Sequence, residues 1–249
     1  MDKLYTEKKL SIVDPSVSAG AMHVEIEHVK KIPAEFSESK QAVHTTIKRS
    51  SPLEKKINRF IKRSFDIIVS LLVIICMLSW LIPLMAILIK LDSKGPVFFL
   101  QKRTGLNGKL FTCIKFRSMI MNAEADLLAE QENDQRITRL GKFLRLRHID
   151  ELPQFFNVLM GDMSIIGPRP YMIAENNIFE NLFKEYNYRH SVKPGMTGFA
   201  QSNGNYGATM DMQKLKQRIH LDILYIQKWS PAMDAKILAR TFRMVAKKV

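Results

Sequence analysis

Cysteine is scarce in this 249-residue sequence: only Cys76 and Cys113 occur, and Cys76 lies inside an apolar run. Two cysteines in these positions exclude the disulfide framework of a small secreted protein and a cysteine-based zinc site. The sequence also lacks internal repeats and any helix-turn-helix, zinc-finger or RNA-binding signature. Its composition, with 46% hydrophobic and 25% charged residues, excludes wholesale disorder. We therefore expect a folded protein from a reducing compartment.

Acidic residues are outnumbered, since 38 Lys and Arg against 24 Asp and Glu give a net charge of +14. Such a surplus suits an anionic partner: nucleic acid, acidic lipid headgroups or phosphorylated substrates. Residues 1–50 are nearly neutral and sustain no helical or alternating apolar pattern, so we expect a flexible extension there. The positive charge belongs to the rest of the chain.

Charge is absent from residues 67–89, and this run exceeds the roughly 20 residues that cross a hydrocarbon core as a helix. It begins too far from Met1 to be a cleaved signal peptide. We therefore expect this segment to contact lipid. No second apolar stretch of that length follows it.

Basic residues stand on both sides of the apolar run. A straight span would place one basic cluster outside the cell, whereas a re-entrant hairpin would keep both on the cytoplasmic side. Pro83 could bend the helix, with the Ser79 hydroxyl available to a freed carbonyl. From the residues alone a kinked ordinary span is favoured, and the hairpin stays open. The flanking basic residues are Lys55, Lys56, Arg59, Lys62, Arg63, Lys90, Lys94, Lys102 and Arg103.

The segment after Gly95-Pro96 has a mixed pattern. Strand-like pieces at residues 97–101 and 109–116 precede helical patterns at 123–132 and 139–147, which predicts a mixed α/β domain. The last forty residues predict two helices, the second with Ser230 as N-cap and Pro231 at its first position. Apolar and basic residues take opposite faces of that second helix. The pattern fits an interfacial helix and a helix packed on the domain equally well.

The densest cluster of chemically capable residues lies between 140 and 170. The adjacent acids Asp150 and Glu151 follow Arg145 and precede Pro153, while Arg169 stands in a loop rich in Gly and Pro. A carboxylate can attack phosphorus or coordinate Mg²⁺, with a neighbouring acid handling protons. A guanidinium in a rigid loop can bind phosphate oxygens. A solvated acid pair and a structural turn remain the plain alternatives.

Several motifs together resemble one family, the bacterial sugar transferases, which are monotopic polyprenyl-phosphate phosphoglycosyl transferases. The resemblance extends from about Ile57 to the C-terminus, and residues 1–50 lie outside it. The matching stretches are Lys115-Phe116-Arg117-Ser118-Met119, Asp150-Glu151-Leu152-Pro153-Gln154, Asn157-Val158-Leu159, Gly161-Asp162-Met163-Ser164, Gly167-Pro168-Arg169-Pro170 and Lys193-Pro194-Gly195-Met196-Thr197-Gly198.

The resemblance implies transfer of a sugar phosphate from a nucleotide sugar to a polyprenol phosphate. It implies Asp150 as the nucleophile and a ligand of Mg²⁺, and Glu151 as its acid/base neighbour. Arg145 and Arg169 would bind phosphate, with Lys115 and Arg117 as further candidates. The region from Gln201 to Ser230 resembles the hexose-1-phosphate branch, which uses UDP-glucose or UDP-galactose with undecaprenyl phosphate and releases UMP.

The resemblance also implies an architecture: a mixed α/β, helix-rich protein with a re-entrant membrane helix and a catalytic domain on the cytoplasmic face of the bacterial inner membrane. Residues 1–50 would be the extension, 51–95 the basic flank and re-entrant helix, bent at Pro83 near Ser79, and 96–249 the catalytic domain with amphipathic interfacial helices. Membrane lipid is an expected partner and nucleic acid is not; a homo-oligomer is left open. A membrane-tethered scaffold that binds anionic lipid or nucleic acid is the alternative function.

Overall fold

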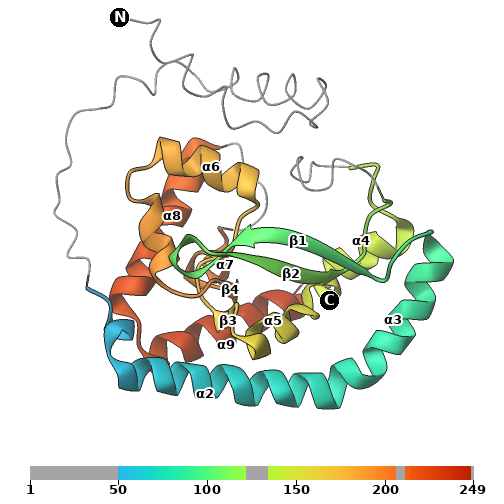
Figure 1. Ribbon diagram of the computed structural model, residues 1–249, viewed down its shortest axis with the longest axis horizontal. Coiled ribbons are helices and arrows are strands. Elements are labelled where there is room, and N and C mark those ends of the chain that lie inside the picture. The colour runs from blue at the N-terminus through green and yellow to red at the C-terminus, as the bar shows by residue number, and fades with distance from the viewer. Residues whose placement is uncertain (1–49, 122–133, 206–210, 248–249) are drawn as a thin grey trace, which may run out of the picture. The chain divides into compact units, whose positions relative to one another are not determined.

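The computed structural model describes residues 50–121, 134–205 and 211–247 (Figure 1). The described residues belong to one compact unit. The predicted extension, apart from Ser50, and the predicted helix at 123–132 lie outside the described residues. The described part is rich in helix and contains two small sheets, in agreement with the helix-rich α/β prediction.

A long apolar helix opens the described chain. It comprises α2 (Lys56–Val73), a π-helical turn at Ile74–Leu78 and α3 (Ser79–Asp92). Among the described residues this is the one helix long and apolar enough to cross a membrane. Large apolar side chains stay exposed along it, which indicates membrane association. They include Ile57, Phe60, Ile61, Phe65, Ile68, Leu71, Leu72, Ile75, Trp80, Leu84, Ile87, Leu88 and Leu91.

The π-helical turn lies where the helix axis changes direction, and Figure 1 shows α3 turning away from the line of α2. The Ser79 N–H bonds the carbonyl of Ile74, five residues back. The Ser79 hydroxyl donates to the carbonyl of Ile75 at 2.7 Å, and the Trp80 indole donates to Cys76 at 3.1 Å. Side chains thus supply hydrogen bonds to carbonyls at the bend, as an apolar environment requires. Pro83 lies within α3 and leaves the Ser79 carbonyl without its usual N–H donor.

The first sheet is a hairpin of β1 (Phe98–Thr104) and β2 (Leu110–Phe116), paired antiparallel with Phe98 opposite Phe116. The two aromatic rings stack with their centroids 5.6 Å apart. Both strands lie where the sequence predicts them, and β1 continues three residues beyond the predicted end at Gln101.

The second sheet is parallel and joins β3 (Ser164–Ile166) to β4 (Gly195–Thr197). A Cβ atom on Gly195 would lie 2.0 Å from the backbone nitrogen of Gly167, so glycine is required for this close approach. The helices around the sheets are α4 (Arg139–Leu146), α5 (Gln154–Met160), α6 (Ile173–Leu182), α7 (Phe199–Ser202), α8 (Met212–Lys228) and α9 (Pro231–Lys247).

Both halves of the long helix pack against the same body. Near α3, one core cluster joins Leu81 and Ile89 to Phe116 of the hairpin and Leu144 of α4. On α2, the buried Lys62 ammonium pairs with the Asp234 carboxylate of α9 at 2.8 Å. Figure 1 shows the hairpin and the helices on the inner side of the bend. The rest of the described chain therefore shares its cores with the long helix.

The C-terminal helix begins as the sequence predicts, since the Ser230 hydroxyl accepts the Met233 N–H at 3.1 Å. Ile237 is buried, and Met233 and Leu238 pack on the larger core cluster. The apolar face of α9 therefore packs mainly against the domain, which was one of the two interpretations that the sequence left open. Phe242, near the end of the helix, is 72% exposed.

Candidate active site

The two adjacent acids lie in a short 3-10 helix, Ile149–Glu151, between α4 and α5. His148 precedes it in the left-handed region, with φ of 55°, and this residue turns the chain out of α4. Pro153 then leads into α5. Asp150 is only 6% exposed, so the turn directs this carboxyl group into the domain instead of into solvent.

Glu151 is held by two cations from different elements. Lys115 of β2 donates to its Oε1 atom at 2.8 Å, and Arg169, in the loop after β3, donates at 2.7 Å to Oε1 and at 3.4 Å to Oε2. Burial raises the pKa of Glu151, but the charges and hydrogen bonds of Arg169 and Lys115 outweigh it and leave the pKa well below its usual value. Glu151 is therefore a firmly ionised carboxylate.

Asp150 behaves differently although it is the next residue. Burial, together with the negative charge of Glu151, raises its pKa to about 6 against the opposing charges of Lys115, Arg145 and Arg169. Two carboxyl groups whose environments separate their pKa values are typical of sites that assign them different roles. Near neutral pH Asp150 is mainly ionised.

Arg145 is in the last turn of α4, and its Nε atom donates to the Ser118 hydroxyl at 2.8 Å. Its positive charge acts on Asp150. The structure therefore brings together five of the six predicted catalytic or phosphate-binding residues around one point. These are Asp150, Glu151, Lys115, Arg145 and Arg169.

Arg117 is the predicted residue that the structure places elsewhere. Its side chain is 3% exposed and caps the end of α3, where Nη2 donates to the carbonyls of Ile89 at 3.2 Å and Ser93 at 2.5 Å. Among the residues that the structure describes, its Nε and Nη1 atoms have no hydrogen-bond partner. Pro83 and Ser79 lie in the long helix, at the bend already described.

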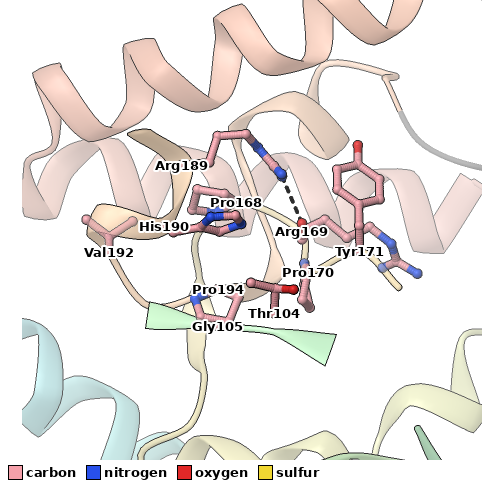
Figure 2. Close-up of a pocket in the computed structure, with 10 residues that line it drawn as sticks. All are labelled: Thr104, Gly105, Pro168, Arg169, Pro170, Tyr171, Arg189, His190, Val192 and Pro194. Atoms are coloured by element: carbon pink, nitrogen blue, oxygen red, sulfur yellow. Dashed lines mark hydrogen bonds between the residues drawn. The ribbon is translucent and has the colours of Figure 1, made fainter. Parts of the chain in front are cut away.

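Two further arginines that sequence reasoning did not assign to the site lie near it: Arg103 was named only as a basic residue flanking the apolar run, and Arg189 was not named. Arg103 donates to the carbonyl of Pro170, and Arg189 donates to the carbonyl of Arg169. Figure 2 shows Arg189 reaching that carbonyl at the edge of a small pocket between Thr104, Arg169 and His190. Neither arginine belongs to a motif, and both contact backbone atoms.

Acidification is expected to destabilise the domain through His190, which lines this pocket. Burial, and then the charge of Arg189, lower the pKa of His190 from 6.5 to about 4, with Glu180 opposing. In the unfolded chain the His190 imidazole binds a proton below about pH 6.5, whereas in the folded protein it does so only near pH 4. The contribution of His190 to the free energy of unfolding is therefore fully present above pH 6.5 and is lost as the pH falls towards 4. Thermal melts of the detergent-solubilised protein should show this loss, and His190→Gln should reduce it. Equal pH dependence in both proteins would assign the effect to other groups.

No group of three or more His, Cys, Asp or Glu side chains within the described ranges is arranged to hold a metal ion. Asp150 nevertheless offers a buried carboxylate on which Lys115, Arg145 and Arg169 act through their charges, whereas Lys115 and Arg169 donate hydrogen bonds directly to Glu151. Mg²⁺ in phosphate-transfer sites is commonly bound by one or two carboxylates together with substrate phosphates. The donor set fits a magnesium site completed by the substrate.

Residues of the C-terminal region that resemble the hexose-1-phosphate branch form buried supports. Arg218 donates to the Tyr171 hydroxyl at 2.9 Å, and Asp222 pairs with Arg189 at 2.8 Å. Tyr225 donates to Asp234 at 2.9 Å. The adjoining stretch Tyr206–Met210 lies outside the described residues.

A protein-family model described as bacterial sugar transferase matches residues 57–248. The chain is 47% identical over 192 residues to a UDP-glucose:undecaprenyl-phosphate glucose-1-phosphate transferase of Klebsiella pneumoniae, a match covering 77% of this chain and 41% of that protein. A protein of the same description from Caulobacter vibrioides is 39% identical over 214 residues, covering 86% and 79% of the two chains.

A third relative is an undecaprenyl-phosphate galactose phosphotransferase of Salmonella typhimurium, 37% identical over 212 residues, which cover 79% of this chain and 42% of that protein. The chain spans about two fifths of the length of the first curated relatives it matches.

Proposed function

The chain belongs to the bacterial sugar transferase family, and from that premise we propose that it transfers a hexose 1-phosphate from a UDP-sugar to undecaprenyl phosphate and releases UMP. This would be the first membrane step of exopolysaccharide, capsule or O-antigen synthesis. The observation that carries the proposal is the pair of adjacent carboxyl groups with separated pKa values, set among Lys115, Arg145 and Arg169.

The proposed chemistry has two displacements at one carboxylate. An oxygen of Asp150 forms a bond to the phosphorus that carries the sugar, the bond from that phosphorus to the bridging oxygen breaks, and UMP leaves with the electron pair. A phosphate oxygen of undecaprenyl phosphate then attacks the same phosphorus, and the Asp150 carboxylate is released. A pKa of about 6 leaves Asp150 ionised, and so able to attack, at neutral pH.

The neighbouring residues bind and orient the reactants. Arg169 and Arg145 present guanidinium groups that suit the oxygens of a diphosphate. Lys115 and Arg169 hold Glu151 as a carboxylate next to Asp150 and keep its pKa well below the usual value. The acid/base role proposed for Glu151 therefore requires these two cations to turn from Glu151 to the substrate phosphates when the diphosphate binds, which would raise the pKa of Glu151. Mg²⁺, held by Asp150 and substrate phosphate oxygens, would neutralise charge that develops on the diphosphate.

The sugar proposed is glucose or galactose. The relatives described above are named for those two sugars. Turnover should be measured with membranes that contain the protein, undecaprenyl phosphate, Mg²⁺ and a panel of labelled UDP-sugars. We expect lipid-linked sugar phosphate and UMP in equal amounts with UDP-glucose or UDP-galactose. Membranes that contain the protein but turn over no UDP-sugar would favour the alternative of a membrane-tethered binding protein.

We also propose that the long helix is re-entrant, with the domain on the cytoplasmic face of the inner membrane. Support comes from its contacts: Lys62 near the start of the helix and Ile89 near its end both pack on the same domain. The bend at Ile74–Leu78, with its side-chain hydrogen bonds, and Pro83 supply the change of direction.

Both ends of the helix are therefore expected on the same side of the membrane. In a protein without its native cysteines, Lys55→Cys and Asn107→Cys place thiols at exposed positions before and after the helix. Neither should react with a membrane-impermeant maleimide in intact cells, and both should react after permeabilisation. Labelling of one position from outside would contradict the hairpin. Pro83→Leu, which restores a helical N–H, should shift the labelling towards that of a straight span.

A further inference from the structure

We propose that Arg189, paired with Asp222, is a positioning residue that holds the segment Pro168–Pro170 and thereby sets the Arg169 guanidinium for the transfer reaction. The inference rests on the proposed function and assigns a role to a residue outside the motifs of the sequence. The evidence is a set of hydrogen bonds to consecutive backbone carbonyls.

Three consecutive carbonyl groups of this segment each receive a donor from a different element. The Pro168 carbonyl accepts the Gly195 N–H of β4 at 2.9 Å. The Arg169 carbonyl accepts Nη2 of Arg189 at 2.8 Å, and the Pro170 carbonyl accepts Nη1 of Arg103 at 2.5 Å. The backbone on both sides of the Arg169 side chain is thus clamped from β4, from the 3-10 helix Tyr186–Ser191 and from β1.

The clamp matters because Pro168 and Pro170 have no N–H group. Proline rings fix φ at both positions and restrict the residue before each ring to extended conformations, so the segment is stiff. Neither proline, however, can anchor the segment through an N–H of its own. Its carbonyls carry that task, and two of the three donors are arginine side chains.

Arg189 is itself fixed on all sides. Its side chain is 3% exposed, and Nε donates to the Asp222 carboxylate at 2.8 Å. The guanidinium carbon lies over the rings of Tyr171 and Tyr186, at 4.7 and 5.0 Å from their centroids. Lysine cannot reproduce this arrangement, because one ammonium group replaces a planar fork that both stacks and donates in two directions.

The positioning role follows from what the clamp controls. Arg169 reaches Glu151 at 2.7 Å from the segment that Arg189 holds. A buried ion pair is weak evidence of stabilisation, because desolvation offsets its attraction. Displacement of a catalytic group by about 1 Å, in contrast, can lower a rate by about 100-fold.

The test is a double-mutant cycle on kcat/KM for UDP-glucose and undecaprenyl phosphate, with Arg189→Lys, Arg169→Ala and the double variant. If Arg189 acts through Arg169, Arg189→Lys should lower kcat/KM by about 10- to 100-fold alone, mainly through kcat. It should change the Arg169→Ala protein by less than about threefold. Lys62→Met is the matched control, because it breaks another buried ion pair. Its effect should multiply with that of Arg169→Ala.

The proposal would be overturned if the fold-losses in kcat/KM of Arg189→Lys and Arg169→Ala multiply in the double variant, as those of Lys62→Met and Arg169→Ala should. It would also be overturned if Arg189→Lys alone leaves kcat/KM unchanged. Asp222→Asn repeats the cycle if Arg189→Lys does not accumulate in membranes. Failure of both variants to accumulate would assign the pair to folding instead.

Amide hydrogen exchange gives a readout that needs no substrate. Arg189→Lys should accelerate exchange in the peptide Gly167–Tyr171 and leave β1 and β2 unchanged, whereas unchanged exchange in that peptide would overturn the clamp. If the wild-type protein shows no turnover but exchange is accelerated in the Arg189→Lys variant, the proposed function would be contradicted. The conclusion that Arg189 holds the Pro168–Pro170 segment would still be supported.

Discussion

Replacing Asp150 with asparagine is expected to abolish formation of lipid-linked sugar phosphate, with a loss of at least about 1,000-fold in kcat. An amide nitrogen or oxygen is too poor a nucleophile towards phosphorus, and too weak a ligand for a hard cation, to replace the carboxylate. The substitution is nearly isosteric, so the buried turn at Ile149–Glu151 should keep its shape. Initial rates with labelled UDP-glucose in membranes measure the effect.

Glu185→Gln supplies the control, because it neutralises an exposed carboxylate on the same domain. That variant should retain wild-type turnover. An Asp150→Asn protein with more than about a tenth of the wild-type rate would remove Asp150 from the role of nucleophile, since loss of a covalent nucleophile costs far more.

Replacing Glu151 with glutamine is expected to lower turnover by about 100- to 1,000-fold, within the lower part of the range of about 100- to 10,000-fold that is typical of general acid–base groups. The change removes the charge that Lys115 and Arg169 both contact, at 2.8 and 2.7 Å. Two largely buried cations would then lack their shared partner, and both would be free to leave the positions that orient the diphosphate.

Glu151→Asp tests whether the site requires the negative charge of Glu151 or the length of its side chain. It keeps the carboxylate on a shorter side chain, so we expect a smaller loss than with glutamine. Rates of the two variants, normalised to protein in the membrane, measure the difference. Equal losses would show that the length of the side chain, and not its charge, is what the site requires.

The sequence predicts the strands β1 and β2 and the long apolar helix well because local patterns determine them. The apolar run at 67–89 lies inside the helix that spans Lys56–Asp92, and β2 begins one residue after its predicted start. The predicted end of β1 at Gln101 is too early because Lys102 and Arg103 interrupt the apolar pattern. In the fold the Arg103 guanidinium is held by Gln101 and the Pro170 carbonyl, which allows the strand to continue.

Motifs in the sequence predict which residues belong to the candidate site only in part. Lys115 and Arg117 are two residues apart, a spacing that places side chains on one face of a strand. Since β2 ends at Phe116, Lys115 reaches Glu151 while Arg117 turns to the end of α3. Arg189 was not foreseeable in the same way, because it binds a backbone carbonyl 20 residues away and no residue type marks such a target.

The Asp150–Glu151 pair illustrates a second limit. Adjacent acids in a sequence carry the same chemical groups, and only burial and the approach of Lys115 and Arg169 separate their pKa values. The resemblance to the sugar transferases implies two roles for the pair. The packed environment supplies a physical reason why one carboxylate stays firmly ionised while the pKa of the other is raised to about 6.

Transfer of phospho-sugar through Asp150 is tested most directly by trapping the enzyme without its acceptor. Purified protein is mixed with UDP-glucose and Mg²⁺, quenched, digested and analysed by mass spectrometry, before and after a chase with undecaprenyl phosphate. We predict a hexose-phosphate adduct on the peptide that contains Asp150, release of one UMP per adduct, and loss of the adduct during the chase. Rapid turnover with acceptor but no adduct or UMP without it would contradict the account, because transfer would then occur in a ternary complex with Asp150 as a metal ligand or base.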